Sequence, residues 1–433
     1  MKTTRILRVI AGLLICSMSL TAQEPVPAKK GNLATAKEAK VGLFVHYVWG
    51  QTKGKPDLYT PMDIKGKKPK DINELADGFD AKKLADFAEA MGAEYVVFTA
   101  FHAGMNVLYP SQVMGEMLPE KASRRDVLKD LQDALDAKGI KLMLYWHPTD
   151  AHDLSQSDKD VILAKYKTWG PFILALMKET SARYGSRVAG YWFDAPAGKD
   201  SQSCVPQFQS IILKDTPDVA IWANRKRQLI PGLSNVTTTE CSPRPNKDLN
   251  TDNWPTDPSQ MCVLAGKGWW AKPNATAVID ARGMFRYTVR IAATKGQTNG
   301  GVCWSDGPYG DNTWPTGTAE AYGEMGKMLR ARKEAIYGTK PSTCYVTLPD
   351  TLQNDIWGVA TDSADGKTVF LHVLNPPTDS ALKIAKPADN RSFAKASLLD
   401  GTPVALKATD SGYELTLPSG AKWDKDDTVI RLQ

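Results

Sequence analysis

The chain has 433 residues, 42% of them hydrophobic and 24% charged, which is enough for more than one domain and a large core. Its formal net charge of +6 is modest for this length, and no basic-aromatic RNA motif occurs, so we expect no nucleic acid partner. The six cysteines form no CxxC pair and no Cys/His cluster of zinc spacing. We therefore expect no metal and no cofactor, whereas one or two disulfides and free buried thiols both remain open.

Residues 1–22 have the pattern of a secretory signal. Basic residues precede an apolar run, 9–20, and the small residues Thr21 and Ala22 follow it. The run is too short to span a membrane, and no other stretch approaches a span. We expect cleavage near Ala22 and an exported protein, periplasmic or secreted.

Short apolar segments alternate with amphipathic segments from residue 41 to about residue 305, a pattern typical of parallel strands joined by crossover helices. Eight candidate strands over roughly 260 residues predict an α/β fold of the (β/α)8 barrel type. A doubly wound open sheet is the alternative, but no GxGxxG follows any strand. The predicted strands are 41–47, 94–101, 141–146, 188–193, 219–223, 235–239, 261–265 and 300–304, and the predicted helices are 80–91, 125–137, 162–184, 282–294 and 320–337.

The pattern changes after the last of these helices. Short strand-like segments broken by Gly, Pro, Asn and Asp predict a small all-β domain, a sandwich. The Lys/Pro/Gly-rich segment 51–79 is expected to be a long loop that is functional or mobile. The predicted parts are a signal peptide, 1–22, a catalytic barrel, 23–341, and a β-sandwich, 342–433, with strands at 344–348, 356–361, 368–374 and in the tail through residue 432.

One stretch, 190–196, runs from an aromatic strand directly into a single carboxylate, Asp194, with Pro196 following. A carboxylate at that place is unfavourable unless it is paired or lies at the open end of the fold. At the carboxyl end of a barrel strand it points toward the chemistry. The alternative is a turn residue or helix cap, a common use of Asp.

The other predicted strands also end in polar or aromatic residues. Each alone has a plain alternative, such as a satisfied core histidine, a core tryptophan or a solvated basic run. Together they predict that the barrel gathers one set of side chains on one rim. The set comprises His46, His102, Tyr145, Trp146, His147, Trp192, Asn224, Arg225, Glu240, Trp304 and Asp306.

This mixture suits a carbohydrate, because aromatic faces stack on sugar rings, polar groups bind hydroxyls, and two carboxylates cleave a glycosidic bond. Asp194 and Glu240 are predicted as the pair, at about 5–5.5 Å for a retaining enzyme. With a much larger separation, His147 or Asp306 would replace Glu240. A metal hydrolase is disfavoured because the first strand lacks HxH, and a serine hydrolase because no GxSxG occurs.

The chain resembles the alpha-L-fucosidase family of retaining glycoside hydrolases (glycoside hydrolase family 29), from about residue 40 to residue 341. The resemblance implies Asp194 as nucleophile and Glu240 as acid/base. It also implies His46, His102 and Arg225 as sugar-binding residues and an aromatic segment around Trp269 beside them. The segments that carry it are VGLFVH (41–46), YVVFTAFH (95–102), YWFD (191–194), PDVAIWANR (217–225), TTE (238–240), GWW (268–270), GGVCWSDGP (300–308) and EAIYGT (334–339).

The chain departs from the family pattern at two places. Its second strand ends in His102-Ala103-Gly104 rather than in two adjacent His followed by Asp-Gly, and no Glu-Trp pair is evident between residues 51 and 79. We therefore regard the chain as a divergent member and expect an exo-glycosidase that releases terminal fucose from an oligosaccharide or glycoconjugate. The alternatives are a related exo-glycosidase for another sugar and a catalytically silent glycan-binding relative. The oligomeric state stays open.

Overall fold

The computed structural model describes residues 32–49, 61–102, 106–148, 154–194, 196, 204–224, 228–241, 260–265, 268–269, 271–277, 280–296, 300–348, 357–378 and 381–433. The predicted signal peptide, Arg225 and the first part of the predicted loop lie outside these residues.

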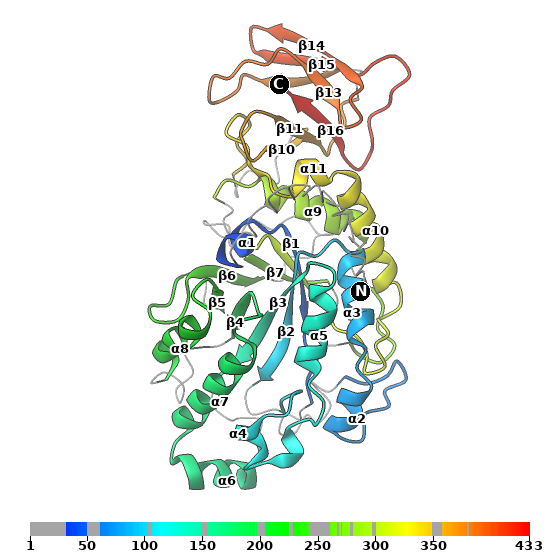
Figure 1. Ribbon diagram of the computed structural model, residues 1–433. Helices are drawn as coiled ribbons and strands as arrows, with labels where there is room; N and C mark the ends of the chain where they lie inside the picture. Colours follow the sequence, from blue (N-terminus) through cyan, green and yellow to red (C-terminus); the bar gives the residue numbers. More distant parts are fainter. Residues whose placement is uncertain are drawn as a thin grey trace, which may run out of the picture. The chain divides into compact units, whose positions relative to one another are not determined.

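Eight parallel strands close into a barrel, in which each strand pairs with the next and β8 pairs with β1 (Figure 1). The (β/α)8 prediction is confirmed. Apolar, β-branched and aromatic residues dominate the strands, as expected where both faces are covered. The strands are β1 (Val41–Val45), β2 (Tyr95–His102), β3 (Lys141–His147), β4 (Gly190–Phe193), β5 (Ala220–Asn224), β6 (Val236–Cys241), β7 (Gln260–Leu264) and β8 (Val302–Ser305).

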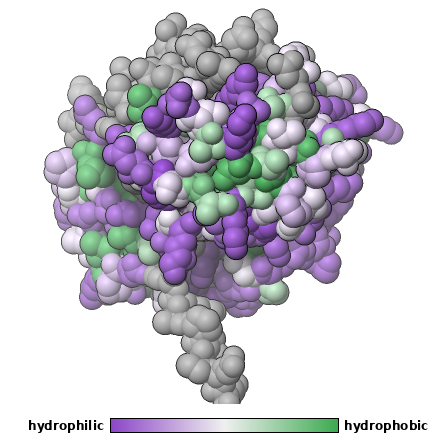
Figure 2. All heavy atoms as spheres, turned by 90° about the horizontal axis from the view of Figure 1, so that it is seen from above, coloured by the Kyte–Doolittle hydropathy of each residue, from purple (hydrophilic) through white to green (hydrophobic). Residues whose placement is uncertain are grey.

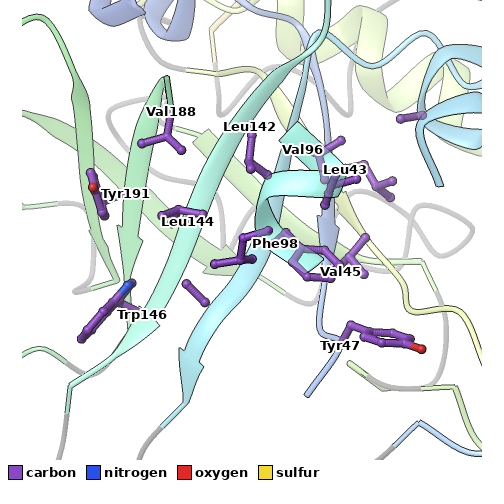
Figure 3. Close-up of a cluster of buried hydrophobic side chains, with 14 of the residues drawn as sticks. Leu43, Val45, Tyr47, Val96, Phe98, Leu142, Leu144, Trp146, Val188 and Tyr191 are labelled. Carbon is purple, nitrogen blue, oxygen red and sulfur yellow. The ribbon is translucent and has the colours of Figure 1, made fainter. Parts of the chain in front are cut away.

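Side chains alternate between two separate cores, as the period of two in a strand requires. Leu43, Leu142 and Tyr191 belong to the outer core, between strands and helices, which Figure 3 shows for the first four strands. Phe44 and Trp222 belong to the inner core, enclosed by the strands. The parity of a residue in its strand therefore decides whether it faces the barrel interior.

Helices surround the barrel (Figure 1), and Asp80 caps α3 as predicted, accepting a hydrogen bond from the Lys83 amide at 2.9 Å. The predicted helix 162–184 is wrong as one helix, because the chain turns at Lys167, whose φ is 64°. The helices are α1 (Asn32–Glu38), α2 (Ile72–Asp77), α3 (Ala81–Ala90), α4 (Gln112–Gly115), α5 (Val127–Asp136), α6 (Gln156–Tyr166), α7 (Trp169–Tyr184), α8 (Phe208–Asp215), α9 (Ala281–Ala293), α10 (Thr318–Ala331) and α11 (Lys333–Ile336), with 3₁₀ turns at Pro119–Lys121 and Val205–Gln207.

The second sheet is antiparallel and forms the predicted C-terminal all-β domain, in the order β12-β15-β14-β13-β16-β11-β10-β9. Apolar side chains from both halves of this order share one core, so the sheet folds over on itself. The predicted strand 344–348 is wrong, and β9 lies just before it. The strands are β9 (Lys340–Pro341), β10 (Gly358–Asp362), β11 (Val369–Val373), β12 (Ala381–Ala385), β13 (Ala396–Leu398), β14 (Pro403–Thr409), β15 (Gly412–Thr416) and β16 (Thr428–Leu432).

Arginines on the barrel helices contact the all-β domain through its backbone. Arg286 of α9 donates to the Leu374 carbonyl and, at 2.7 Å, to the Asn375 side chain. Arg332, between α10 and α11, donates to the Asp427 carbonyl from two nitrogens, at 3.0 and 2.8 Å. Charge-assisted bonds of this kind are directional, so they fix how the domain seats on these helices.

The surface is mixed in polarity. Figure 2 shows one face on which hydrophilic residues predominate and hydrophobic residues form small groups. Among the described residues, no helix is long and apolar enough to cross a bilayer. The described cysteines Cys204, Cys262, Cys303 and Cys344 are buried and form no disulfide, which favours the buried-thiol alternative for these four.

Candidate active site

The carboxyl ends of the barrel strands bring a set of inward-facing side chains together. Parity places them on the interior face, two residues beyond inner-core residues such as Phe44, Trp192 and Trp222. Hydrogen bonds and ring contacts link these side chains into one set. It comprises His46, His102, Tyr145, His147, Asp194, Asn224 and Glu240.

A β-bulge directs His102 inward. The register between β2 and β3 shifts between Thr99 and Phe101, so that Phe101 pairs with Trp146 and His102 pairs with His147. Without the extra residue, Phe101 would face the interior and His102 the outer core. With it, the His102 ring stacks on the His147 ring at 4.7 Å and on the Tyr145 ring at 5.7 Å between centroids.

Asp194 and Glu240 share one amide. The Asn224 Nδ2 donates to Asp194 Oδ1 at 3.0 Å and to Glu240 Oε2 at 2.9 Å. The Tyr145 hydroxyl donates to the second oxygen, Asp194 Oδ2, at 2.9 Å. Because the two N–H bonds of a planar amide diverge by about 120°, oxygens that accept from both lie about 5 Å apart.

The two carboxyl groups differ in environment. Partial burial raises the pKa of Glu240 and the charge of Asp194 raises it further, whereas the hydrogen bond from Asn224 opposes the rise. Asp194 accepts hydrogen bonds on both oxygens, from Tyr145 and Asn224, which hold this carboxyl group in place. Glu240 is thus suited to carry a proton beside the fixed carboxyl group of Asp194.

His46 is a neutral polar group beside this pair. Burial, with a smaller contribution from His147, lowers the pKa of His46 to about 3. Its Nδ1 lies 3.2 Å from the Thr99 hydroxyl, and its ring meets the Tyr145 ring edge-on at 4.6 Å. A neutral imidazole can both donate and accept, which suits contact with a sugar hydroxyl.

Aromatic rings line the interior next to the polar set. Trp192 stacks on Tyr145 at 5.6 Å, and Trp269 lies 5.7 Å from Phe44 and 5.8 Å from His46 between centroids. The Trp192 indole nitrogen donates to Gln260 Oε1 at 2.9 Å and to the Thr238 hydroxyl at 3.2 Å, which fixes the plane of the ring. Trp192, Tyr145 and Phe44 are buried, whereas Trp269 is half-buried, so Trp269 is the ring of this group that offers an accessible apolar face, as sugar recognition needs.

The expectation that Trp146 faces the interior is wrong. Its ring packs in the outer core against Phe101, 5.0 Å between centroids, because Tyr145 takes the inward place before it (Figure 3). Arg225, which follows Asn224, lies outside the described residues.

Asp306, named from the sequence as a substitute acid/base, takes outward parity after Trp304 and Ser305. It is buried, accepts a hydrogen bond from the Gly307 amide at 2.9 Å, and acts electrostatically on Tyr309 and Tyr322. Burial raises the pKa of Asp306 to about 7. It therefore belongs to the layer behind β8 and not to the inward set.

This burial predicts a pH-dependent gain in stability for Asp306→Asn. A carboxyl group whose folded pKa is raised stabilises the fold below its unfolded pKa, and that contribution is lost as the pH rises through the folded value, here about 7. The neutral amide keeps the acceptor for Gly307 and does not ionise. We expect the variant to gain about 2–4 kcal/mol over the wild type between pH 4 and pH 8, measured by denaturant unfolding. Asp311→Asn, at an exposed position nearby, is the matched control, and an equal response in both variants would contradict the prediction.

Other parts of the described structure offer no rival site of the same kind. Within the described ranges, no three His, Cys, Asp or Glu side chains are grouped as metal ligands. A hollow of about 390 Å³ is lined by Glu94, Ile140 and Tyr337 among others. Glu94 and Ile140 precede β2 and β3, so this hollow lies at the amino ends of the strands, away from the carboxyl pair.

The sequence names Asn224 only as one of the strand-end residues and His147 only as a substitute acid/base, although strand parity places both on the interior face. Asn224 shares parity with Trp222, and His147 with Tyr145. Gln260, which holds Trp192, gives no sequence signal, because it lies just before the predicted strand 261–265 and enters only the observed β7.

A parallel barrel that presents two carboxyl groups and aromatic rings at the carboxyl ends of its strands has the architecture of a glycoside hydrolase. The comparisons with known proteins then identify the family.

The family model for alpha-L-fucosidase matches residues 71–334, which is more than half of the chain. The plasma alpha-L-fucosidase of Rattus norvegicus is 24% identical over 420 residues, covering 88% of this chain and 86% of that protein. Its Homo sapiens counterpart is 23% identical over 416 residues, covering 88% and 85%. The chain belongs to the alpha-L-fucosidase family and is thereby a glycoside hydrolase with a glycan substrate.

Solved structures show the same fold. An alpha-L-fucosidase GH29 from Bacteroides thetaiotaomicron superposes with a TM-score of 0.68 at 20% identity, covering 93% of this chain and 96% of that chain. The Thermotoga maritima alpha-fucosidase superposes with a TM-score of 0.67 at 16% identity, covering 93% and 97%. Another Bacteroides thetaiotaomicron structure, with a TM-score of 0.66 at 18% identity over 93% and 97%, is a trapped covalent intermediate with 2-fluoro-fucosyl fluoride.

Proposed function

We propose that the protein is an exported, retaining exo-glycosidase that releases terminal alpha-L-fucose from glycans. The observation that carries the proposal is the amide of Asn224 between Asp194 and Glu240. The separation it implies, about 5 Å, corresponds to double displacement and leaves no room for a water molecule between sugar and base, as inversion would need.

In the first step, an oxygen of Asp194 attacks the anomeric carbon while Glu240 gives its proton to the departing glycosidic oxygen. In the second step, ionised Glu240 takes a proton from water, and that water cleaves the glycosyl ester and frees Asp194. The raised pKa of Glu240 supports its role as the initial acid. The hydrogen bonds on both oxygens of Asp194 hold the carboxyl group in place, which supports its role as the nucleophile.

Sugar recognition is proposed to come from the groups around the carboxyl pair. His46, which burial keeps neutral, and the polar groups of His102 and Tyr145 offer hydrogen bonds to hydroxyls, and Trp269 offers an apolar face, with Trp192 kept as a proposed binding residue from the sequence. Arg225 is kept as a proposed substrate-binding residue on the sequence resemblance alone. Fucose as the sugar is supported by the matched family model and by the names of the relatives.

Export is proposed from the amino-terminal sequence. Its basic start, apolar run and small residues near Ala22 support a cleaved signal peptide and a periplasmic or secreted mature protein. The full-length relatives include proteins named as plasma enzymes.

A panel of 4-nitrophenyl glycosides tests the proposed function. We expect cleavage of the alpha-L-fucoside in preference to other sugars, and proton NMR of the early product should show alpha-L-fucose before mutarotation, since double displacement retains configuration. An early beta anomer would contradict the mechanism. Cleavage of another glycoside alone would indicate the related exo-glycosidase, and glycan binding without any cleavage would indicate the silent relative.

A further inference from the structure

Asn224 occupies the only barrel strand between the two that carry the carboxyl groups. β5 pairs with β4 on one side, Phe193 opposite Ala223, and with β6 on the other, Asn224 opposite Thr238. An inward side chain at the carboxyl end of β5 therefore reaches both neighbours. The two hydrogen bonds, 3.0 Å to Asp194 and 2.9 Å to Glu240, use the same nitrogen.

A side-chain amide has the chemistry that this place requires. It supplies two N–H donors in one plane, whereas a hydroxyl supplies one. It carries no charge, so it holds both carboxyl groups without forcing either to ionise, whereas a Lys or Arg would favour two carboxylates. Oε2 of Glu240 accepts a hydrogen bond from Asn224. The acid proton therefore belongs on the other oxygen, Oε1.

We propose that Asn224 is a positioning residue of the reaction, which sets the separation of the two carboxyl groups and directs the acid proton to Oε1 of Glu240. In the first step the Oε1–H bond breaks and the proton goes to the glycosidic oxygen, as the bond from that oxygen to the anomeric carbon breaks and the bond from Asp194 forms. Asn224 stays uncharged throughout, and its two donors persist while the charge moves from Asp194 to Glu240. The inference rests on the proposed function.

The kinetic test compares Asn224→Ala with the wild type on aryl alpha-L-fucosides. We expect kcat to fall by about 10²-fold with little change in KM, because orientation of the acid and the nucleophile is lost while sugar contacts remain. The loss should be larger for phenyl than for 2,4-dinitrophenyl fucoside, since only the poorer leaving group needs the proton. The alkaline limb of kcat/KM should move to higher pH, because the hydrogen bond that favours ionised Glu240 is gone.

Two further variants make the kinetic result specific. Asn224→Asp keeps the shape but replaces donors by a negative charge, so its alkaline limb should move further than that of the alanine variant. Asn235→Ala removes an amide that pairs with the backbone of Ile221 in β5 and of Val219 just before it, both at 2.8 Å. It should keep the wild-type pH profile. A profile of Asn224→Ala that superimposes on the wild type, with equal losses for both leaving groups, would overturn the proposal.

A titration separates this inference from the proposed function. With glutamate labelled by carbon-13 at the side-chain carboxyl, NMR follows the ionisation of Glu240, assigned through Glu240→Gln, without any turnover. The midpoint should be higher in Asn224→Ala than in the wild type, whichever sugar the enzyme accepts. An unchanged midpoint would overturn the role of Asn224 even for an active fucosidase, and failure of the wild type to cleave any glycoside would overturn only the proposed function.

Discussion

Asp194→Ala is expected to lower turnover of an aryl alpha-L-fucoside by about 10⁴-fold or more, while the protein stays folded and still binds the sugar. The carboxylate is proposed as the group that forms the bond to the anomeric carbon, and no neighbour can take its place. Tyr145 and Asn224 donate to it, and Glu240 is needed as the acid. Initial rates measure the loss of turnover, and calorimetry with fucose measures the retained binding.

A comparison with Glu240→Ala makes the result diagnostic. An activated aryl group leaves with little protonation, so this variant should form the glycosyl-enzyme but hydrolyse it slowly, and added azide should restore the second step. Asp218→Ala, at an exposed position before β5, is the matched carboxylate control. Full activity of Asp194→Ala, in a preparation free of other hydrolases, would exclude the mechanism.

The barrel could be predicted from the sequence because its strands are short apolar runs between amphipathic helices, and all eight lie within about two residues of their expected places. The interruptions within helical segments were harder to predict. Residues 162–184 keep a helical pattern of apolar residues, and only the left-handed turn at Lys167 divides them. Lysine is not a residue type that predicts a positive φ.

The residues of the candidate site could be predicted from the strand ends, but the direction in which each side chain faces could not. Tyr145 and Trp146 are neighbours at one strand end, and only parity counted from inner-core residues shows that the tyrosine faces inward. Counting parity gives the wrong face for His102, because the bulge shifts the parity of the residues that follow it. A bulge depends on the pairing of two strands, so a single sequence does not specify it.

Contacts between distant segments are the least predictable part of the molecule. His372, in β11, and Asp427, before β16, are both buried, with Nδ1 at 2.8 Å from Oδ2. The other ring nitrogen, Nε2, lies 3.1 Å from the Ala335 carbonyl of α11, and Arg332 lies 3.4 Å from the same carboxylate. The His372 ring thus joins β11 to α11 and to the segment before β16 through both of its nitrogens.

Asp427→Asn is therefore expected to lower the free energy of unfolding by about 1–3 kcal/mol, because the buried His372 ring loses its carboxylate partner, while Arg332 keeps Asp424 at 2.7 Å. The substitution keeps the size of the side chain, so the loss reports charge rather than packing. Circular dichroism during urea unfolding measures it, at constant pH. Asp365→Asn, on the exposed turn between β10 and β11, should leave the midpoint unchanged. If the two variants unfold at the same urea concentration, the contact between the barrel helices and the all-β domain depends on Arg286 and apolar packing instead.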